Sequence, residues 1–195
     1  INMNKNTEYY VFHKRNFLDK KYCDNYITEL NKHSWEKHIW YNPRLDATKA
    51  LSENNEPEHI YAEELPEMHN LLSEMMPMIQ STILEYIESF KLDWFTGWQG
   101  ISVMKFIRYH PGQTMKTHWD QIHSIFDGER KGVPTLSIIG LLNDDFEGGE
   151  LIMFEDKKID IKKGDLIIFP SNFLYPHKIT PVIKGVRYSY TGWVW

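Results

Sequence analysis

The residues best suited to bind a metal or take part in a reaction are a histidine and a carboxylate two positions apart, His118 and Asp120. They form the only His-x-Asp or His-x-Glu pair in the chain. In a β-strand, residues two apart point to the same side, so both side chains can face one cavity. A histidine nitrogen and a carboxylate oxygen are two of the three ligands that hold non-haem Fe(II) in oxygenases. A solvated histidine beside a surface aspartate is the alternative, and the pair needs support from elsewhere in the chain.

His177 is the candidate third ligand, and Arg187 follows it ten residues later in the run HKITPVIKGVR. The alternative for His177 is a partly buried histidine that is hydrogen-bonded to backbone. Arg187 lies in a predicted strand whose alternate residues face inward, and the local sequence offers it no obvious partner. A buried guanidinium favours a bidentate acid. The distal carboxylate of 2-oxoglutarate is such an acid, and a structural salt bridge is the alternative.

The elements that must position these residues differ between the two halves of the chain. In the first half, Asp19 can cap a helix that runs to about Asn31. A second helix is predicted over 66–91, where apolar residues recur near a 3.6-residue period and Pro77 would kink or split the helix. The polar, aperiodic stretch from about 38 to 64 predicts a long loop between them.

From Trp98 onward, short apolar runs separated by Gly, Pro, Asn and Asp predict many short strands. We expect eight of them, near residues 99–109, 114–120, 135–142, 150–154, 157–162, 165–169, 177–182 and 186–194. Eight strands after a helical preface predict a mainly β fold with flanking helices, in which a jelly roll closes over a central cleft.

Three segments of the second half carry a family resemblance. They are RYHPGQTMKTHWD (108–120), LSIIGLLNDDFEGGELIMF (136–154) and KGDLIIFPSNFLYPHKITPVIKGVRYSYTGW (163–193). In order and spacing they resemble prolyl 4-hydroxylases and PKHD-type hydroxylases of the 2-oxoglutarate/Fe(II)-dependent dioxygenase family. The resemblance covers about 98–195 and implies a cupin-like, double-stranded β-helix core. We expect one domain over 1–195, with a helical preface over 1–97 and the catalytic core over 98–195.

The resemblance also assigns roles to residues of this chain. It implies that the iron ligands are His118, Asp120 and His177 and that Arg187 pairs with the distal carboxylate of 2-oxoglutarate. The implied cofactors are Fe(II), 2-oxoglutarate as co-substrate and O2, with ascorbate (vitamin C) as a candidate reductant. Such an enzyme hydroxylates its substrate and releases succinate and CO2. Related halogenases replace the carboxylate ligand by a small residue, so Asp120 favours hydroxylation.

Further residues of the cleft follow from the same resemblance. Tyr109 matches a tyrosine that lines the co-substrate pocket, and Ser137 is a candidate for a weak contact with the co-substrate. Trp193 matches an inward aromatic near the substrate, with plain core packing as its alternative. His123, three residues past Asp120, is a candidate substrate contact or an exposed loop histidine. Many prolyl 4-hydroxylases have a tyrosine three residues before the first ligand, where this chain has Met115. A thioether cannot donate a hydrogen bond, which weakens the prediction of prolyl specificity.

Composition narrows the functional classes. The net charge is −5 and no run of Lys or Arg exceeds a pair, so the sequence lacks the basic footprint of a nucleic-acid-binding protein. Nucleic-acid demethylases of the superfamily place a second arginine six residues after the first, where this chain has Trp193. Without an apolar run of membrane-spanning length, and with Cys23 as the only cysteine, the chain is predicted to be cytoplasmic and not bound to membranes.

The leading functional prediction is hydroxylation of a prolyl residue in a peptide or protein. The segments 38–64 and 121–134 are long enough to fold over an extended substrate chain. The alternative within the enzyme class is hydroxylation of a free amino acid or another small molecule. A third possibility is a non-catalytic jelly-roll binding module, although such a module would not require Arg187 next to an intact set of metal ligands. The sequence does not specify an oligomeric state.

Overall fold

The computed structural model describes residues 6–39, 55–95, 97–102, 104–121 and 133–195. Its strands form a seven-stranded major sheet in the order β1-β10-β6-β13-β4-β3-β2 and a four-stranded minor sheet in the order β5-β11-β8-β9. The major-sheet strands are β1 (Phe12–Lys14), β2 (Glu36–Lys37), β3 (Glu58–Tyr61), β4 (Lys105–Tyr109), β6 (Leu136–Leu141), β10 (Leu166–Pro170) and β13 (Arg187–Val194). The minor-sheet strands are β5 (Met115–His118), β8 (Leu151–Met153), β9 (Lys157–Lys158) and β11 (His177–Ile179). A separate pair joins β7 (Glu147–Gly148) to β12 (Val182–Lys184).

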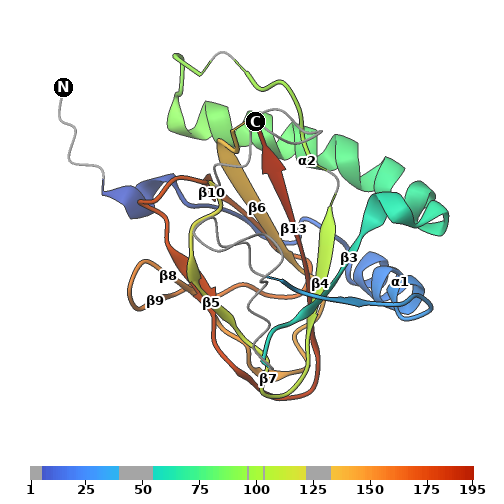
Figure 1. Ribbon diagram of the computed structural model, residues 1–195. Helices are drawn as coiled ribbons and strands as arrows, with labels where there is room; N and C mark the ends of the chain where they lie inside the picture. Colours follow the sequence, from blue (N-terminus) through green and yellow to red (C-terminus); the bar gives the residue numbers. More distant parts are fainter. Residues whose placement is uncertain (1–5, 40–54, 96, 103, 122–132) are drawn as a thin grey trace, which may run out of the picture.

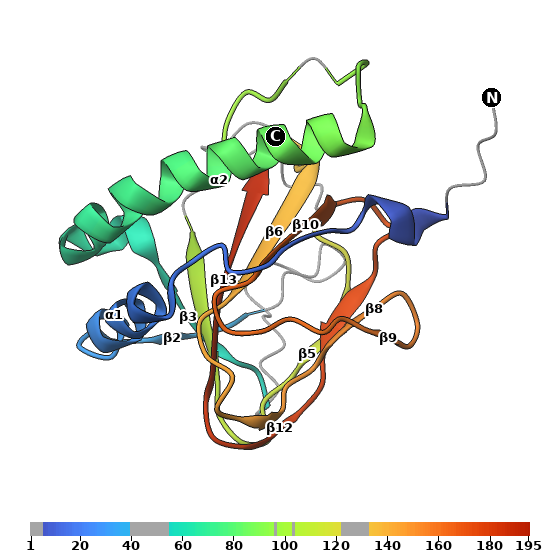
Figure 2. The same ribbon diagram turned by 180° about the vertical axis from the view of Figure 1, so that it is seen from behind.

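Two helices cover one face of the major sheet, and the minor sheet lies on the other side, as Figures 1 and 2 show from opposite directions. The helices are α1 (Lys20–Leu30) and α2 (His69–Phe90). Short 3-10 turns lie at Thr7–Tyr10, Ala62–Glu64 and Pro66–Met68. This arrangement is the double-stranded β-helix that the sequence predicted.

Alternation along the central strands builds two apolar layers. On β6, Ile138 packs toward the helices and Ile139 packs between the two sheets. The helix-side layer includes Tyr26 of α1 and Ile79 of α2, and the layer between the sheets includes Met153 of β8. Because successive strand residues point to opposite faces, a sheet with both faces covered is apolar at nearly every position. All six residues of β6 are buried for this reason.

Both predicted helices are present. The Asp19 carboxylate accepts a hydrogen bond from the Lys21 backbone N–H, so it caps α1 as its position indicated. The second helix was predicted to be kinked or split at Pro77, but α2 runs unbroken through that residue. Its buried side chains on the sheet-facing stripe, among them Met75 and Ile79, hold the helix together where one backbone hydrogen bond is missing.

The predicted preface and strand boundaries need correction at several places, including the predicted strand 157–162, of which only Lys157–Lys158 form a strand, β9. The region 1–97 is not wholly helical, because β1, β2 and β3 extend the major sheet at both edges. Part of the predicted loop 38–64 is therefore strand β3, and residues 40–54 lie outside the described part. The predicted strand 177–182 is two strands, because Thr180 and Pro181 separate β11, which joins the minor sheet, from β12. Residues 99–104 contribute only a bridge between Ile101 and Val194 among their described positions.

Candidate metal centre and co-substrate pocket

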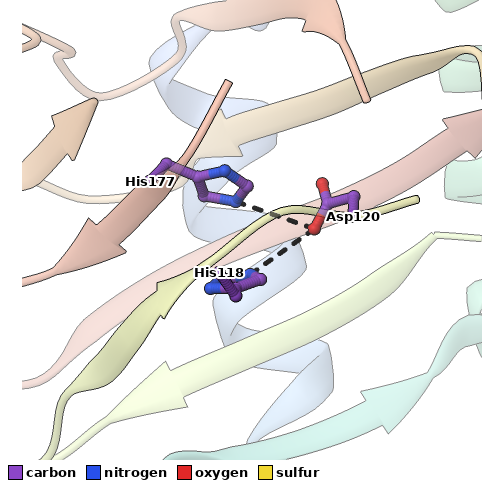
Figure 3. A group of neighbouring side chains, drawn as sticks. All are labelled: His118, Asp120 and His177. Atoms are coloured by element: carbon purple, nitrogen blue, oxygen red, sulfur yellow. Dashed lines mark ion pairs between the residues drawn. The ribbon is translucent and has the colours of Figure 1, made fainter. Parts of the chain in front are cut away.

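His118, Asp120 and His177 come together between the two sheets (Figure 3). One potential ligand atom from each side chain lies within 4.8 Å of the others. His118 Nε2 is 3.4 Å and His177 Nε2 is 3.7 Å from Asp120 Oδ1. His118 ends β5 and His177 begins β11, and these residues are direct partners in the antiparallel pairing of the two strands. Asp120 follows two residues after His118, so it returns to the same side of the chain.

The outer nitrogen of each imidazole is held by a backbone carbonyl. His118 Nδ1 lies 2.7 Å from the Lys116 carbonyl oxygen, and His177 Nδ1 lies 3.2 Å from that of Tyr175. Because a carbonyl only accepts hydrogen bonds, both rings must donate from Nδ1. In the neutral form of each ring, Nε2 then carries the lone pair and lies on the side that faces Asp120. This tautomer and the fixed ring orientation are what an imidazole needs to bind a metal ion.

The electrostatics of the group suit a cation. Burial lowers the pKa of His177, which keeps that imidazole neutral. Burial acts against the charged carboxylate of Asp120, but its interactions with the facing His177 and His118 rings outweigh burial and hold its pKa well below the usual range. Two histidines and one ionised carboxylate on one side of a cavity match the donor set that binds Fe(II) in oxygenases. The residues present therefore fit such an ion.

A cavity of about 340 Å³ opens beside the three side chains. Its floor is made by alternate residues of β4 and β13 from the major sheet, and its roof by residues of β5 and β11 from the minor sheet. The floor residues are Lys105, Ile107, Tyr109, Arg187, Ser189, Thr191 and Trp193. The jelly roll thus places a pocket between its two sheets, with the candidate metal ligands in the wall.

Arg187 is the largest of the fully buried side chains, with 1% of its surface exposed. Its Nη1 donates to the Ser189 hydroxyl at 2.7 Å, and its guanidinium carbon lies 5.2 Å from the centre of the Tyr109 ring. Its Nε and Nη2 have no hydrogen-bond partner in the described part of the chain. A buried charged group without partners is costly, so these donors fit a carboxylate ligand in the cavity. The sequence analysis reached the same inference from the missing local partner.

Ser137, Tyr109 and Trp193 take different positions around the cavity. Tyr109 and Trp193 line it, Tyr109 directly opposite Arg187 in the pairing of β4 with β13. Ser137 is fully buried and shares a 2.8 Å hydrogen bond with the Ser171 hydroxyl. It also forms a hydrogen bond that helps to hold the pKa of Asp120 low, after the larger effects named above. Ser137 therefore supports a candidate metal ligand, and its predicted contact with the co-substrate stays a prediction.

Two residues of the sequence analysis need separate mention. Met115 is buried and lines the cavity, so an apolar thioether stands in a wall where the resembling family carries a tyrosine. His123 lies outside the described residues.

The sequence analysis missed Lys105 and its neighbours His38 and Tyr61, which also line the cavity. A signal for Lys105 was present, because it precedes Ile107 and Tyr109 at two-residue spacing and must share their face of the strand. A lysine within an otherwise apolar alternation on a central strand indicates an inward charge. His38 offered no such signal, because only the pairing of β2 with β3 brings that part of the chain to the cavity.

Residues 104–195 match the family model of the 2OG-Fe(II) oxygenase superfamily, and all six predicted site residues lie within the matched range. Over this range, just under half of the chain, the sequence is similar to the 2OG-Fe(II) oxygenase superfamily. This similarity implies Fe(II), 2-oxoglutarate and O2 as cofactors, in agreement with the donor set found in the cavity.

Among the relatives to which the chain is similar are PKHD-type hydroxylases. A PKHD-type hydroxylase of Idiomarina loihiensis is 36% identical over 91 residues, which are 45% of this chain and 39% of the relative. A second, from Synechococcus elongatus, is 30% identical over 101 residues, which are 49% of this chain and 44% of the relative. Each alignment spans less than half the length of the relative.

Solved structures of prolyl hydroxylases share the fold. The viral collagen prolyl hydroxylase of Paramecium bursaria chlorella virus-1, in its 2-oxoglutarate complex, superposes with a TM-score of 0.65 at 21% identity, covering 95% of this chain and 94% of the viral one. A Pseudomonas putida prolyl-4-hydroxylase gives 0.69 at 18% identity, covering 94% and 91%. A Trichoplax adhaerens prolyl hydroxylase, in complex with a hypoxia inducible factor peptide, gives 0.71 at 17% identity, covering 95% and 83%. At these identities the likeness is one of fold.

Proposed function

We propose that this oxygenase hydroxylates its substrate with Fe(II) bound by His118, Asp120 and His177 and with 2-oxoglutarate anchored by Arg187. The observation that carries the proposal is one cavity holding both the three convergent ligand atoms and a buried guanidinium with open donors. When bound, Fe(II) and 2-oxoglutarate supply the oxidation, in which the keto acid becomes succinate and CO2 and one oxygen atom of O2 enters a C–H bond of the substrate.

The protein residues have separable tasks in this proposal. The carbonyls of Lys116 and Tyr175 fix the two imidazoles before any ligand arrives, so little reorganisation accompanies metal binding. Arg187 binds the far carboxylate of the keto acid, and the Tyr109 ring fixes the plane of its guanidinium. The apolar side chains of Ile107, Ile139 and Ile179 keep water away from the reacting groups.

The proposed substrate is a prolyl residue of a peptide or protein. Support comes from the structural neighbours, among them the Trichoplax enzyme bound to a peptide, and from the PKHD-type relatives. One observation favours the alternative, a free amino acid or another small molecule. A second buried cation, Lys105, lines the cavity. A prolyl ring within a peptide has no negative charge to pair with this cation, whereas a free amino acid has a carboxylate.

The non-catalytic binding module has little support. A binding module needs neither the preset histidine tautomers nor the open donors of Arg187. The described residues contain no helix of the length and apolarity needed to cross a membrane. A cytoplasmic location remains part of the proposal, supported by the single, buried Cys23.

The test is succinate formation from 2-oxoglutarate by anaerobically iron-loaded protein after admission of O2, with and without proline-rich peptides or free amino acids. Turnover stimulated by peptide supports prolyl hydroxylation, and turnover stimulated only by small molecules supports the alternative. Asp120→Ala serves as the inactive control, and Lys184→Met, an exposed change on β12, serves as the matched surface control. Adding ascorbate to parallel assays checks whether it acts as a reductant. The proposal fails if wild-type protein forms no succinate with either class of compound.

A further inference from the structure

Lys105 is a buried cation that faces the cavity from the opposite end of the same strand as Tyr109. Only 7% of its surface is exposed, and it lines the cavity together with the candidate metal ligands. It pairs with Thr191 of β13 and with Tyr61 of β3, so strands on both sides fix its backbone. Its ammonium interacts electrostatically with Asp120 and His118, which places the charge close to the candidate metal centre.

The close contacts of Lys105 are with neutral groups. Its Nζ lies 3.2 Å from His38 Nδ1 and 5.4 Å from the centre of the Tyr61 ring. Burial, with the positive charge of Lys105, lowers the pKa of His38 to about 3, so this ring is neutral and accepts a hydrogen bond from the ammonium. In the described part of the chain, no carboxylate lies within ion-pairing distance of Nζ. An ammonium has three donors, and buried charges are normally paired.

The second cation begins at the opposite end of the cavity floor from Arg187. Arg187 is opposite Tyr109, and Lys105 is four residues away from Tyr109 on β4. At about 3.4 Å per residue this separates the two backbone positions by ~14 Å. In a five-carbon diacid, four bonds of about 1.5 Å join the terminal carbons, and the bond angles shorten their extended span to about 5 Å. A keto acid held by Arg187 thus leaves the Lys105 end of the cavity for the primary substrate.

We propose that Lys105, supported by His38, binds a carboxylate of the primary substrate and so selects substrates that carry one near the hydroxylated carbon. This inference rests on the proposed function and narrows its substrate class. Two sources supply the same chemistry. One is the α-carboxylate of a free amino acid, and the other is an acidic side chain next to the target residue in a peptide.

The experiment compares matched ligands that differ only in charge. L-proline is paired with L-prolinamide, and acetyl-Pro-Glu-amide is paired with acetyl-Pro-Gln-amide. Each is titrated anaerobically into protein loaded with Fe(II) and 2-oxoglutarate, and the perturbation of the visible charge-transfer absorption gives the dissociation constant. The titrations use wild type, Lys105→Met, Lys105→Arg and the surface control Lys184→Met.

We expect wild type and Lys184→Met to bind the carboxylate member of at least one pair tenfold or more tightly than its amide. Lys105→Met should lose that preference, and Lys105→Arg should keep part of it. The pair that shows the preference identifies the source of the carboxylate. Equal binding of both members of both pairs by wild type overturns the inference. A Lys105→Met protein whose only defect is weaker binding of 2-oxoglutarate also overturns it.

The experiment distinguishes failure of the proposed function from failure of the proposed role of Lys105. Absence of the charge-transfer absorption from wild-type protein contradicts the proposed function. A normal absorption without discrimination between carboxylate and amide contradicts the role of Lys105 alone.

Discussion

His177 lies directly across an antiparallel strand pair from His118, and the centres of their imidazole rings are 4.3 Å apart. A directly opposed pair on the minor sheet therefore supplies two of the candidate ligands, although 59 positions separate them in the sequence. Asp120 lies just beyond the end of β5, where the chain is free of ladder hydrogen bonds and can turn its carboxylate toward both rings. The register of β5 against β11 is thus the structural requirement for the metal centre.

Arg187→Ala should raise the 2-oxoglutarate concentration needed for half-maximal turnover by more than tenfold. The physical reason is that Nε and Nη2 are buried without described partners, so the side chain is poised for a carboxylate. Losing one member of a buried charge pair costs about 2–5 kcal/mol. Arg187→Lys keeps the charge but loses the bidentate geometry and should give an intermediate value. Titration of succinate formation against 2-oxoglutarate measures the effect, and an unchanged requirement in Arg187→Ala would remove this residue from the co-substrate site.

Lys105→Met should stabilise the folded protein at neutral pH while impairing substrate binding. Burial lowers the pKa of Lys105 from 10.5 to about 8, so the folded state disfavours the charged form. This difference corresponds to about 3 kcal/mol as an upper bound. Because the unfolded chain keeps its proton to a higher pH, wild-type stability should rise between about pH 8 and pH 10.5.

The pH dependence provides the control for that prediction. Chemical denaturation of both proteins should show the advantage of Lys105→Met constant below about pH 8 and shrinking as the pH rises toward 10.5. Lys184→Met, which removes an exposed ammonium, should show neither effect. A Lys105→Met protein that is less stable than wild type at pH 7 would show that the buried ammonium is compensated by contacts beyond those described.

Features that depend on neighbouring residues could be predicted from the sequence, and features that depend on tertiary contacts could not. The spacing of His118 and Asp120 and the cap at Asp19 follow from neighbouring residues and were predicted. The fold followed from the density of short strands. Strand β3 was not predictable, because its residues gain their place only by pairing with β4 across the major sheet. The prediction of a kink or break at Pro77 was wrong for the same reason, because packing of α2 on the sheet outweighs the local cost of a proline.

The site showed the same division. The sequence indicated six residues, and the structure brings five of them to one cavity, with Ser137 placed beside Asp120 and Ser171. The sequence did not indicate the hydrogen bond between Ser137 and Ser171, which depends on how β6 packs against the segment after β10. It also did not indicate His38, which reaches Lys105 from 67 positions away. Contacts of this kind are set by tertiary packing and leave no periodic trace in the sequence.

Gly140→Ala should destabilise the protein by more than about 2 kcal/mol. A Cβ at this position would lie 2.0 Å from the Tyr190 ring, which packs directly across the strand pair. Thermal or chemical denaturation measures the loss. In a Tyr190→Ala background the same change should cost much less, because the obstructing ring is gone. Equal costs in the two backgrounds would mean that Tyr190 does not fill the space above Gly140.

Anaerobic Fe(II) binding to wild type, Asp120→Ala and His177→Ala, measured by calorimetry with circular dichroism as the check on folding, tests the account most directly. Wild type should bind about one Fe(II) per chain through the three-ligand group. Each variant should remain folded and bind more than about 100-fold more weakly, because loss of even an outer supporting partner costs about 10–100-fold. Folded variants that bind Fe(II) as tightly as wild type would contradict the metal centre and the proposed activity that depends on it.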